Sequence, residues 1–159
     1  MEPVLFVVSQ LRSLGATVAD FPFMTDKAEE MGQKVLYPPS VFSYFSPGFR
    51  IRGTPLGGPE FQIYTSVTSL VRVNFIGQLI SNGFGADVTI NYQPFTSRAA
   101  DAGALVDYCN LLFMGGNMST QMRSDIINAI QATPATNTTE RVRTALYLTM
   151  AGGQYQVDR

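Results

Sequence analysis

The fold is decided by residues 59–81, which read PEFQIYTSVTSLVRVNFIGQLIS and form the longest run with helical periodicity in the chain. Its apolar residues recur at the three- and four-residue spacing of one helix face: Ile63, Tyr64, Val67, Leu70, Val71, Phe75 and Leu79. Only Glu60 and Arg72 are charged, and such a sparsely charged helix is typical of one that is surrounded by others. We therefore expect a long central helix over this range.

Two helices are predicted before it. Residues 3–14 place Val4, Val7, Val8 and Leu11 at helical spacing, and Gly15 suits a C-terminal cap. The second helix is expected to begin at Thr25 or Asp26, which can cap it, and to end before Pro38 and Pro39. Its expected apolar stripe is Ala28, Met31, Val35 and Leu36.

Three more helices are predicted after the central one. They run from about Ser97 to Gly115-Gly116, from a Ser119 cap to Thr133-Pro134, and from an Asn137 cap to Gly152-Gly153, after which we expect a polar tail. Within the glycine- and proline-containing segment 82–95, residues 86–90 are predicted to form a short strand or an extended loop, and the sequence shows no evident partner strand. The sequence thus predicts an all-α fold, an irregular bundle of about six helices around the central helix, in one domain over residues 1–159.

Residues 37–59 have a different composition, because aromatic residues alternate there with proline and glycine. We expect a long ordered loop, with room for a short helical turn at residues 40–45. The aromatic side chains are expected to anchor this loop on the helices, which is the usual role of aromatics in such loops. The alternative is that they stack on a sugar or, with Arg50 and Arg52, hold an acidic ligand.

Composition argues against several function classes. The chain has no histidine, which removes the commonest general base and most zinc sites, and we expect no catalytic constellation, metal site or cofactor. The net charge is −1 and the basic residues are dispersed, so nucleic acid is not an expected partner. The early apolar run at residues 4–8 is too short for a membrane span.

Three local features suggest sites but have simpler structural explanations. Residues 53–58, GTPLGG, resemble a phosphate-binding loop, although their spacing favours a tight turn into a proline-started helix. Asp26, Glu29 and Glu30 fit a solvated helix start better than a calcium site. Cys109 lies on an apolar stripe, which favours a buried, inert thiol over a nucleophile.

Several short motifs, in this order and spacing, resemble a bacterial family known as domain of unknown function 1800. They are EPVLF at residues 2–6, MGQ at 31–33, YPPSVF at 37–42, GPEFQI at 58–63, LLFMGG at 111–116, RVRTALYL at 141–148 and YQV at 155–157. The resemblance is to the C-terminal part of the family, whose members are longer. The resemblance implies that this chain is of bacterial origin and is a C-terminal fragment of a longer protein. It also implies export from the cytoplasm, as for many members, and it brings no assigned activity.

Two hypotheses about function follow. The first is a helical structural or interaction module of a larger exported bacterial protein, whose partner is the N-terminal remainder of the same polypeptide. The second is part of an enzyme or carbohydrate-binding site, in which Arg50, Arg52, Glu60 and Tyr64 line a cleft that the missing portion completes and that takes a small molecule or glycan. Whether the chain is an enzyme stays open.

Overall fold

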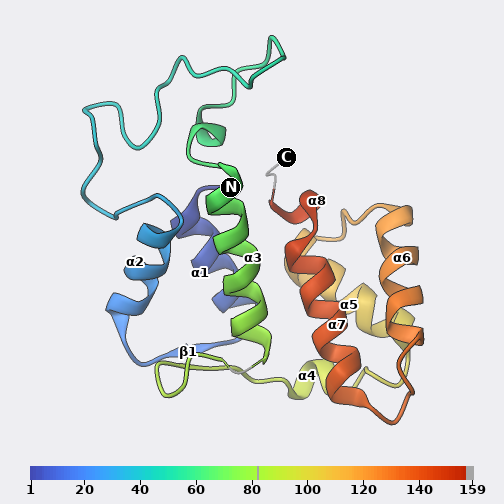
Figure 1. Cartoon of the computed structure of the whole chain (residues 1–159). Coiled ribbons are helices and arrows are strands. Elements are labelled where there is room, and N and C mark those ends of the chain that lie inside the picture. Colours follow the sequence, from blue (N-terminus) through green and yellow to red (C-terminus); the bar gives the residue numbers. More distant parts are fainter. Residues whose placement is uncertain (82, 157–159) are drawn as a thin grey trace.

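The computed structural model describes residues 1–81 and 83–156 and shows a helical molecule, as predicted (Figure 1). The α-helices are α1 (Pro3–Ser13), α2 (Phe21–Glu30), α3 (Ser66–Ser81), α4 (Gln93–Thr96), α5 (Ala102–Met114), α6 (Thr120–Gln131), α7 (Thr138–Ala151) and α8 (Gly153–Gln156). A 3-10 helix, η1 (Pro59–Gln62), precedes α3, and two short strands, β1 (Thr17–Val18) and β2 (Val88–Thr89), complete the secondary structure. Asn82 and Val157, which belong to the predicted loop and to the last family motif, lie outside the described residues.

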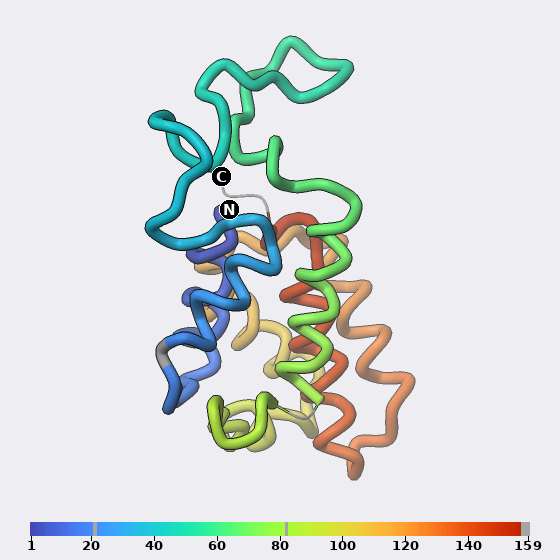
Figure 2. Tube along the Cα trace, turned by 60° about the vertical axis from the view of Figure 1, so that its left-hand side comes forward, coloured from blue at the N-terminus to red at the C-terminus, as the bar shows by residue number. Residues whose placement is uncertain are grey.

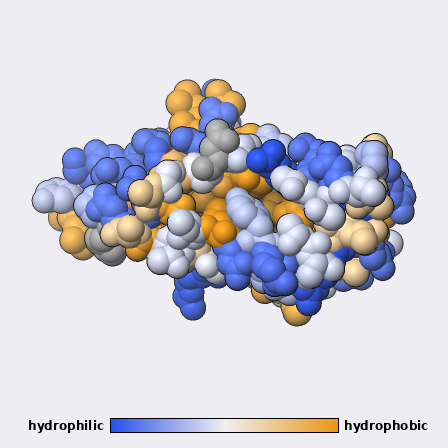
Figure 3. Space-filling model, turned by 90° about the horizontal axis from the view of Figure 1, so that it is seen from below, coloured by the Kyte–Doolittle hydropathy of each residue, from blue (hydrophilic) through white to orange (hydrophobic). Residues whose placement is uncertain are grey.

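The core forms where α3 and α7 lie side by side (Figure 1). Helix α7 packs against α3, α4, α5, α6 and α8, while α1 contacts α2 and α5. Helix α3 contributes Phe75, Ile76, Leu79 and Ile80 to this core, and α7 contributes Val142, Ala145, Leu146 and Met150. The predicted α3 stripe is wrong at Val67 and Leu70, which are exposed. Seen from the end that carries β1 and α4 (Figure 3), hydrophobic residues lie in the middle and hydrophilic residues at the two sides.

The predicted central helix is interrupted near its start. Residues 59–62 form η1, and α3 begins only at Ser66. The reason is a reciprocal cap that the periodicity does not reveal: the Thr65 Oγ1 accepts a hydrogen bond from the Thr68 amide at 3.2 Å, and the Thr68 Oγ1 accepts one from the Thr65 amide at 2.8 Å. Such a pair satisfies free amides at a helix start, so it sets the start of α3 at this point.

The second helix was predicted too late in the chain. It begins at Phe21, with Pro22 in its first turn, and ends at Glu30. Gly32 then adopts a φ of +96°, which ends the helix, and Leu36 also has a positive φ, of +67°. The predicted stripe is therefore wrong beyond Met31, because Leu36 is 87% exposed.

Gln33 explains why the chain turns there. Its side chain is buried, its Oε1 accepts a hydrogen bond from the Val4 amide at 2.8 Å, and its Nε2 donates to the Glu2 carboxylate at 2.8 Å. It thereby caps the start of α1 from a distant part of the chain, since Glu2 itself makes no side-chain cap.

The strand predicted within residues 86–90 has a partner after all. Val88 and Thr89 pair antiparallel with Val18 and Thr17, respectively, from the segment between α1 and α2. A two-residue strand carries too little pattern to be matched with a partner about 70 residues away, so the pairing could not be read from the sequence.

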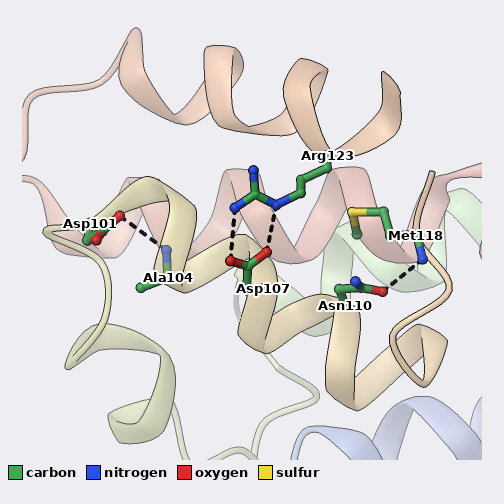
Figure 4. Close-up of polar contacts among 6 residues, drawn as sticks. All are labelled: Asp101, Ala104, Asp107, Asn110, Met118 and Arg123. Atoms are coloured by element: carbon green, nitrogen blue, oxygen red, sulfur yellow. Dashed lines mark hydrogen bonds and ion pairs between the residues drawn. The ribbon is translucent and has the colours of Figure 1, made fainter. Parts of the chain in front are cut away.

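Helices α5, α6 and α7 begin at side-chain caps. The predicted caps Ser119 and Asn137 accept hydrogen bonds from Met122 and Glu140 amides, each at 3.2 Å. The helix expected from about Ser97 begins instead at Ala102, because the Asp101 carboxylate accepts from the Ala104 amide at 3.1 Å (Figure 4). Residues 93–96 form the separate short helix α4.

Polar contacts also join α5 to α6 (Figure 4). The Arg123 guanidinium donates Nε and Nη2 to the two Asp107 carboxylate oxygens, at 2.7 and 2.9 Å. The Asn110 side chain accepts a hydrogen bond from the Met118 amide at 2.9 Å and fixes the turn between the two helices.

The segment predicted to be a polar tail is helical as far as it is described, because residues 153–156 form α8 and bury Tyr155 and Gln156.

Arg141, at the start of α7, joins three segments. Its side chain is buried, and its Nε donates to the Thr133 carbonyl at 2.9 Å, after α6. Its Nη1 donates to the Ala99 and Ala100 carbonyls at 3.1 and 3.0 Å, before α5. Thr133 follows the C-terminal end of α6, where free carbonyl groups and the helix dipole favour a cation.

We expect Arg141→Met to lower the free energy of unfolding by about 2–4 kcal/mol, because it removes three hydrogen bonds to carbonyl groups, one of them buried and two part-buried. Arg143→Met is the matched control on the same helix. Its guanidinium is half-exposed and donates to Ser81, so the expected cost is below about 1 kcal/mol. Urea unfolding of both variants measures the difference, and equal losses would show that Arg141 has no special role.

The Asp107–Arg123 pair predicts a small pH dependence. Hydrogen bonding from Arg123 lowers the pKa of Asp107, so its contribution to stability is complete above the ordinary carboxyl pKa of 3.8 and disappears as the pH falls through the lower folded value. Because both side chains are largely exposed, Asp107→Asn should cost only about 0.5 kcal/mol at pH 7. Thermal melts of the wild type and Asp107→Asn from pH 7 to pH 2 check this. Asp125→Asn is the control, because the partner of Asp125 is the neutral Gln121. A difference in melting temperature between the wild type and Asp107→Asn that is the same at pH 2 as at pH 7 would contradict the prediction.

Candidate functional site

The four residues that the sequence singles out lie in two places. Glu60 and Tyr64 line a cavity of about 20 Å³ at the start of α3, together with Met1, Phe61, Arg72 and Gln156. Arg50 and Arg52 are exposed on the preceding loop and do not line this cavity. The structure thus brings Glu60 and Tyr64 together and leaves Arg50 and Arg52 apart from them, and a role of all four in binding stays a prediction.

Arg72 is the polar residue at the centre of the cavity wall, and its side chain is only 2% exposed. Its Nη2 donates to the Met1 carbonyl at 3.0 Å. The rings of Phe6 and Tyr64 each lie 4.9 Å from its Cζ, so aromatic faces stabilise the cation. Burial lowers the pKa of Arg72, but an arginine keeps its charge at neutral pH.

Two nitrogens of this buried guanidinium have no hydrogen-bond acceptor among the described residues. They are Nε and Nη1, and the contact with Met1 does not involve them. Buried polar groups are nearly always paired, so each exception calls for an explanation. The sequence offers one clue to this residue, because Arg72 is the lone cation in a long apolar helix; its burial and missing acceptors depend on the fold.

The other wall of the cavity is fixed by α8. The Tyr64 hydroxyl donates to the Gln156 Oε1 at 3.0 Å, and the Gln156 Nε2 donates to the Ala151 carbonyl at 3.2 Å. These bonds connect the start of α3 to the end of α7. The cavity is therefore built from three distant parts of the chain, residues near 1, 60–72 and 156.

The second feature is the long loop, residues 36–58, which we call the arm. It projects beyond the ends of the helices in both views (Figures 1 and 2). Most of the large hydrophobic side chains that are exposed among the described residues lie on the arm or on the first turns of α3: Leu36, Tyr37, Val41, Phe42, Leu56, Val67 and Leu70. Val41 is 95% exposed, and Phe42 is 68% exposed, so Phe42 does not anchor the arm on the helices as predicted for the aromatic residues.

The arm nevertheless has a defined structure. Ile51 donates to the Leu56 carbonyl at 3.0 Å and Gly58 donates to the Phe49 carbonyl at 3.2 Å, which closes a small hairpin. A Cβ at Gly58 would lie 2.9 Å from the Ile51 Cδ1, so a larger residue there would push the Ile51 side chain aside. Residues 40–45 were predicted to have room for a short helical turn, but they form a non-helical turn in which Ser43 has a φ of +101°.

The arm is also held at its base. The Ser46 amide donates to the Gln62 side chain at 2.6 Å, and the Tyr44 hydroxyl donates to the Lys34 carbonyl. Tyr44 thus anchors the loop as predicted, whereas Phe42 and Tyr37 remain exposed. The GTPLGG segment lies in the hairpin and leads into η1, in agreement with the predicted tight turn.

The remaining candidates have structural roles. Burial raises the pKa of the Cys109 thiol to about 12, so it is not a nucleophile at neutral pH. Glu29 and Glu30 form exposed ion pairs with Lys34 and Lys27. The part of the chain that the structure describes contains no group of three or more histidine, cysteine or acidic residues arranged to hold a metal ion. Within the same residues, every helix is too short or too polar to cross a membrane.

Wider hollows lie on the helical surface, and two of them exceed 300 Å³ among the described residues. One, of about 340 Å³, follows the α3–α7 contact and is lined by Gly77, Tyr147 and the Glu140–Arg143 pair, among others. The other, of about 390 Å³, lies between α6 and the α7–α8 turn and includes Met122 and Gly152. Neither contains a buried polar group without a partner, in contrast to the Arg72 cavity.

Comparison with known proteins gives one match. No curated protein and no solved structure matches the chain. The family described as "Protein of unknown function (DUF1800)" matches residues 1–157, nearly the whole length, which confirms the resemblance that the sequence motifs suggested. The chain belongs to the DUF1800 family.

Proposed function

We propose that this chain is a helical interaction module, and that its arm docks onto the remainder of a longer, exported bacterial polypeptide. The observation that carries the proposal is the arm itself, a structured segment that exposes apolar side chains. Exposed apolar patches on soluble proteins are typical of interaction sites, because an unburied patch is costly in water.

The composition of the arm supports a protein surface as its partner. Residues 36–58 contain only two charged residues, Arg50 and Arg52, and several aromatic ones. Interface cores are enriched in aromatic residues and arginine and depleted of other charges. The expected partner surface is therefore apolar with acidic groups near the arginines.

Two arguments favour the rest of the same polypeptide over another protein. The family resemblance indicates longer members, of which this chain matches the C-terminal part. The arm also leaves the helices at the end of the molecule where Met1 contacts α3 and α8 (Figure 1). A segment that preceded residue 1 would thus lie next to the arm.

The alternative, a carbohydrate-binding or enzyme site completed by the missing portion, is favoured by one observation. Arg50 and Arg52 are exposed on the same arm as Tyr37 and Phe42, a combination that suits sugar rings and acidic groups. In that case Arg50→Ala with Arg52→Ala should abolish glycan binding by the full-length protein and leave its melting temperature unchanged. Glycan-array binding of the full-length protein distinguishes the two proposals.

The interaction proposal predicts that Val41→Ser with Phe42→Ser weakens binding of this module to the separately produced upstream portion by at least about tenfold, because apolar anchors dominate interface energies. Titration calorimetry measures the affinity. Leu111→Ser is the matched control, since Leu111 is 65% exposed on α5 and does not belong to the arm.

Both variants should keep the wild-type melting temperature, because their side chains are exposed. Equal affinities of the arm variant and the control would contradict the proposal, as would no binding by the wild type. Sedimentation of the module alone measures whether it forms a dimer. If it does, and if the arm variant is a monomer, the partner of the arm is a second copy of this chain, and our proposal that the arm binds the upstream portion is wrong.

A further inference from the structure

The hollow of about 340 Å³ along the α3–α7 contact combines an aromatic ring with charged side chains, and the interaction proposal does not use it. On α3 it is lined by Gly77, Ile80 and Ser81, in the last turns of the helix. Gly77 lies roughly three helical turns, or about 16 Å, beyond Ser66 at the end of α3 that adjoins the arm. The hollow is therefore a surface separate from the arm.

Tyr147 supplies the aromatic wall of this hollow. It is 38% exposed, and its Cε2 atom would lie 3.8 Å from a Cβ at Gly77, so the ring lies close to the backbone of α3. Aromatic rings that are fixed on one side and open to water provide a large apolar contact area with little loss of conformational entropy on binding. Such a ring suits the apolar face of a sugar.

Arg143 and Glu140 supply the polar wall. The Arg143 Nη2 donates to the Ser81 carbonyl at 3.0 Å, which holds the guanidinium at the end of α3. Its Nη1 lies 3.9 Å from the Glu140 Oε2, which is beyond hydrogen-bonding distance, and the two side chains are 42% and 54% exposed. Both charged groups line the hollow and are accessible to a ligand.

The separation of these two groups selects a hydroxyl. A hydroxyl oxygen about 2.8 Å from each atom fits between them, because it can accept from the Arg143 Nη1 and donate to the Glu140 Oε2. A carboxylate has no proton to donate and is repelled by Glu140, and an ammonium group is repelled by Arg143. The pair therefore favours a neutral ligand that carries hydroxyl groups.

A second hollow adjoins the first. It measures about 190 Å³ and shares Ile80, Ser81 and Arg143 with its neighbour. Thr96 and Thr139 add hydroxyl groups to its lining. Ligand pockets commonly measure about 300–1,000 Å³, so the first hollow has room for a sugar ring and the second for part of the next one.

We infer that the two hollows, which we call the α3–α7 groove, bind a neutral oligosaccharide. One sugar ring lies on Tyr147, one of its hydroxyl groups lies between Arg143 and Glu140, and the adjacent sugar extends toward Thr139. The groove is distinct from the arm and from its exposed Arg50 and Arg52, so this inference does not depend on the interaction proposal.

Saturation-transfer NMR of this chain with cellobiose, maltose and chitobiose tests the inference, and titration gives the affinity of each sugar that binds. We expect at least one disaccharide to bind at least about fivefold more tightly than its monosaccharide, because its second ring enters the adjoining hollow. Glucuronate should bind at least about fivefold more weakly than glucose, because Glu140 repels it. Equal binding of glucuronate and glucose would contradict the selection of a neutral ligand.

Three variants locate the binding. Arg143→Met and Tyr147→Ala should each weaken it at least about tenfold, whereas Tyr147→Phe, which keeps the ring, should stay within about threefold of the wild type. Gly77→Leu should abolish binding because its side chain occupies the hollow, and it should still fold because leucine favours a helix more than glycine does. Arg12→Met, which removes an exposed arginine from α1, is the matched control and should bind as the wild type does.

Three results would overturn the inference. The first is that the folded wild type binds none of the three disaccharides, which would mean that water alone occupies the groove. The second is equal binding by the wild type, Arg143→Met and Gly77→Leu. The third is loss of binding in Arg50→Ala with Arg52→Ala, which would place the sugar on the arm.

Discussion

The C-terminal half of the structure depends on the buried guanidinium of Arg141. It gathers three carbonyl groups from the turns that precede α5 and follow α6, and holds both turns against the first turn of α7. With this end fixed, the apolar face of α7 can pack against α3 on one side and against α5 and α6 on the other. A charge buried in this way fixes geometry more than it adds stability, because hydrogen bonds to carbonyls offset its desolvation cost.

Arg72 and Arg141, the two arginines that are buried among the described residues, differ in their hydrogen-bond partners. Arg141 has a protein acceptor for its Nε and its Nη1, whereas Arg72 has an acceptor only for its Nη2. The same contrast holds for apolar groups: the helices bury theirs in one core, while the arm exposes Val41 and Phe42 although its backbone is ordered by hydrogen bonds. The arm and the start of α3 thus lie at the same end of the molecule, although Gln10 in α1 and Thr149 in α7 also have buried side-chain atoms without a hydrogen-bond partner among the described residues.

The sequence predicts most of the helices well, but it predicts the arm and the start of α3 poorly. Periodicity finds α1, α5, α6 and α7, and the residue types Ser119 and Asn137 locate two caps, because both signals are local. It misses the Thr65–Thr68 cap, the turn at Gly32 and the pairing of β1 with β2, each of which depends on backbone geometry or on a distant segment. Of the predicted site residues, Glu60 and Tyr64 line the cavity, but their neighbour Arg72 was not among the predicted residues, because its burial requires Met1, Phe6 and Gln156 to come together in space.

The central claim is that the arm of this DUF1800 chain is a docking element whose partner lies in the longer polypeptide. Hydrogen exchange, followed by mass spectrometry, tests it most directly by comparing peptides from residues 36–58 in the separate module and in the full-length protein. The account predicts that exchange of these peptides slows at least about tenfold in the full-length protein, while peptides from α5 and α6 stay the same. Equal exchange of the arm in both proteins would contradict it.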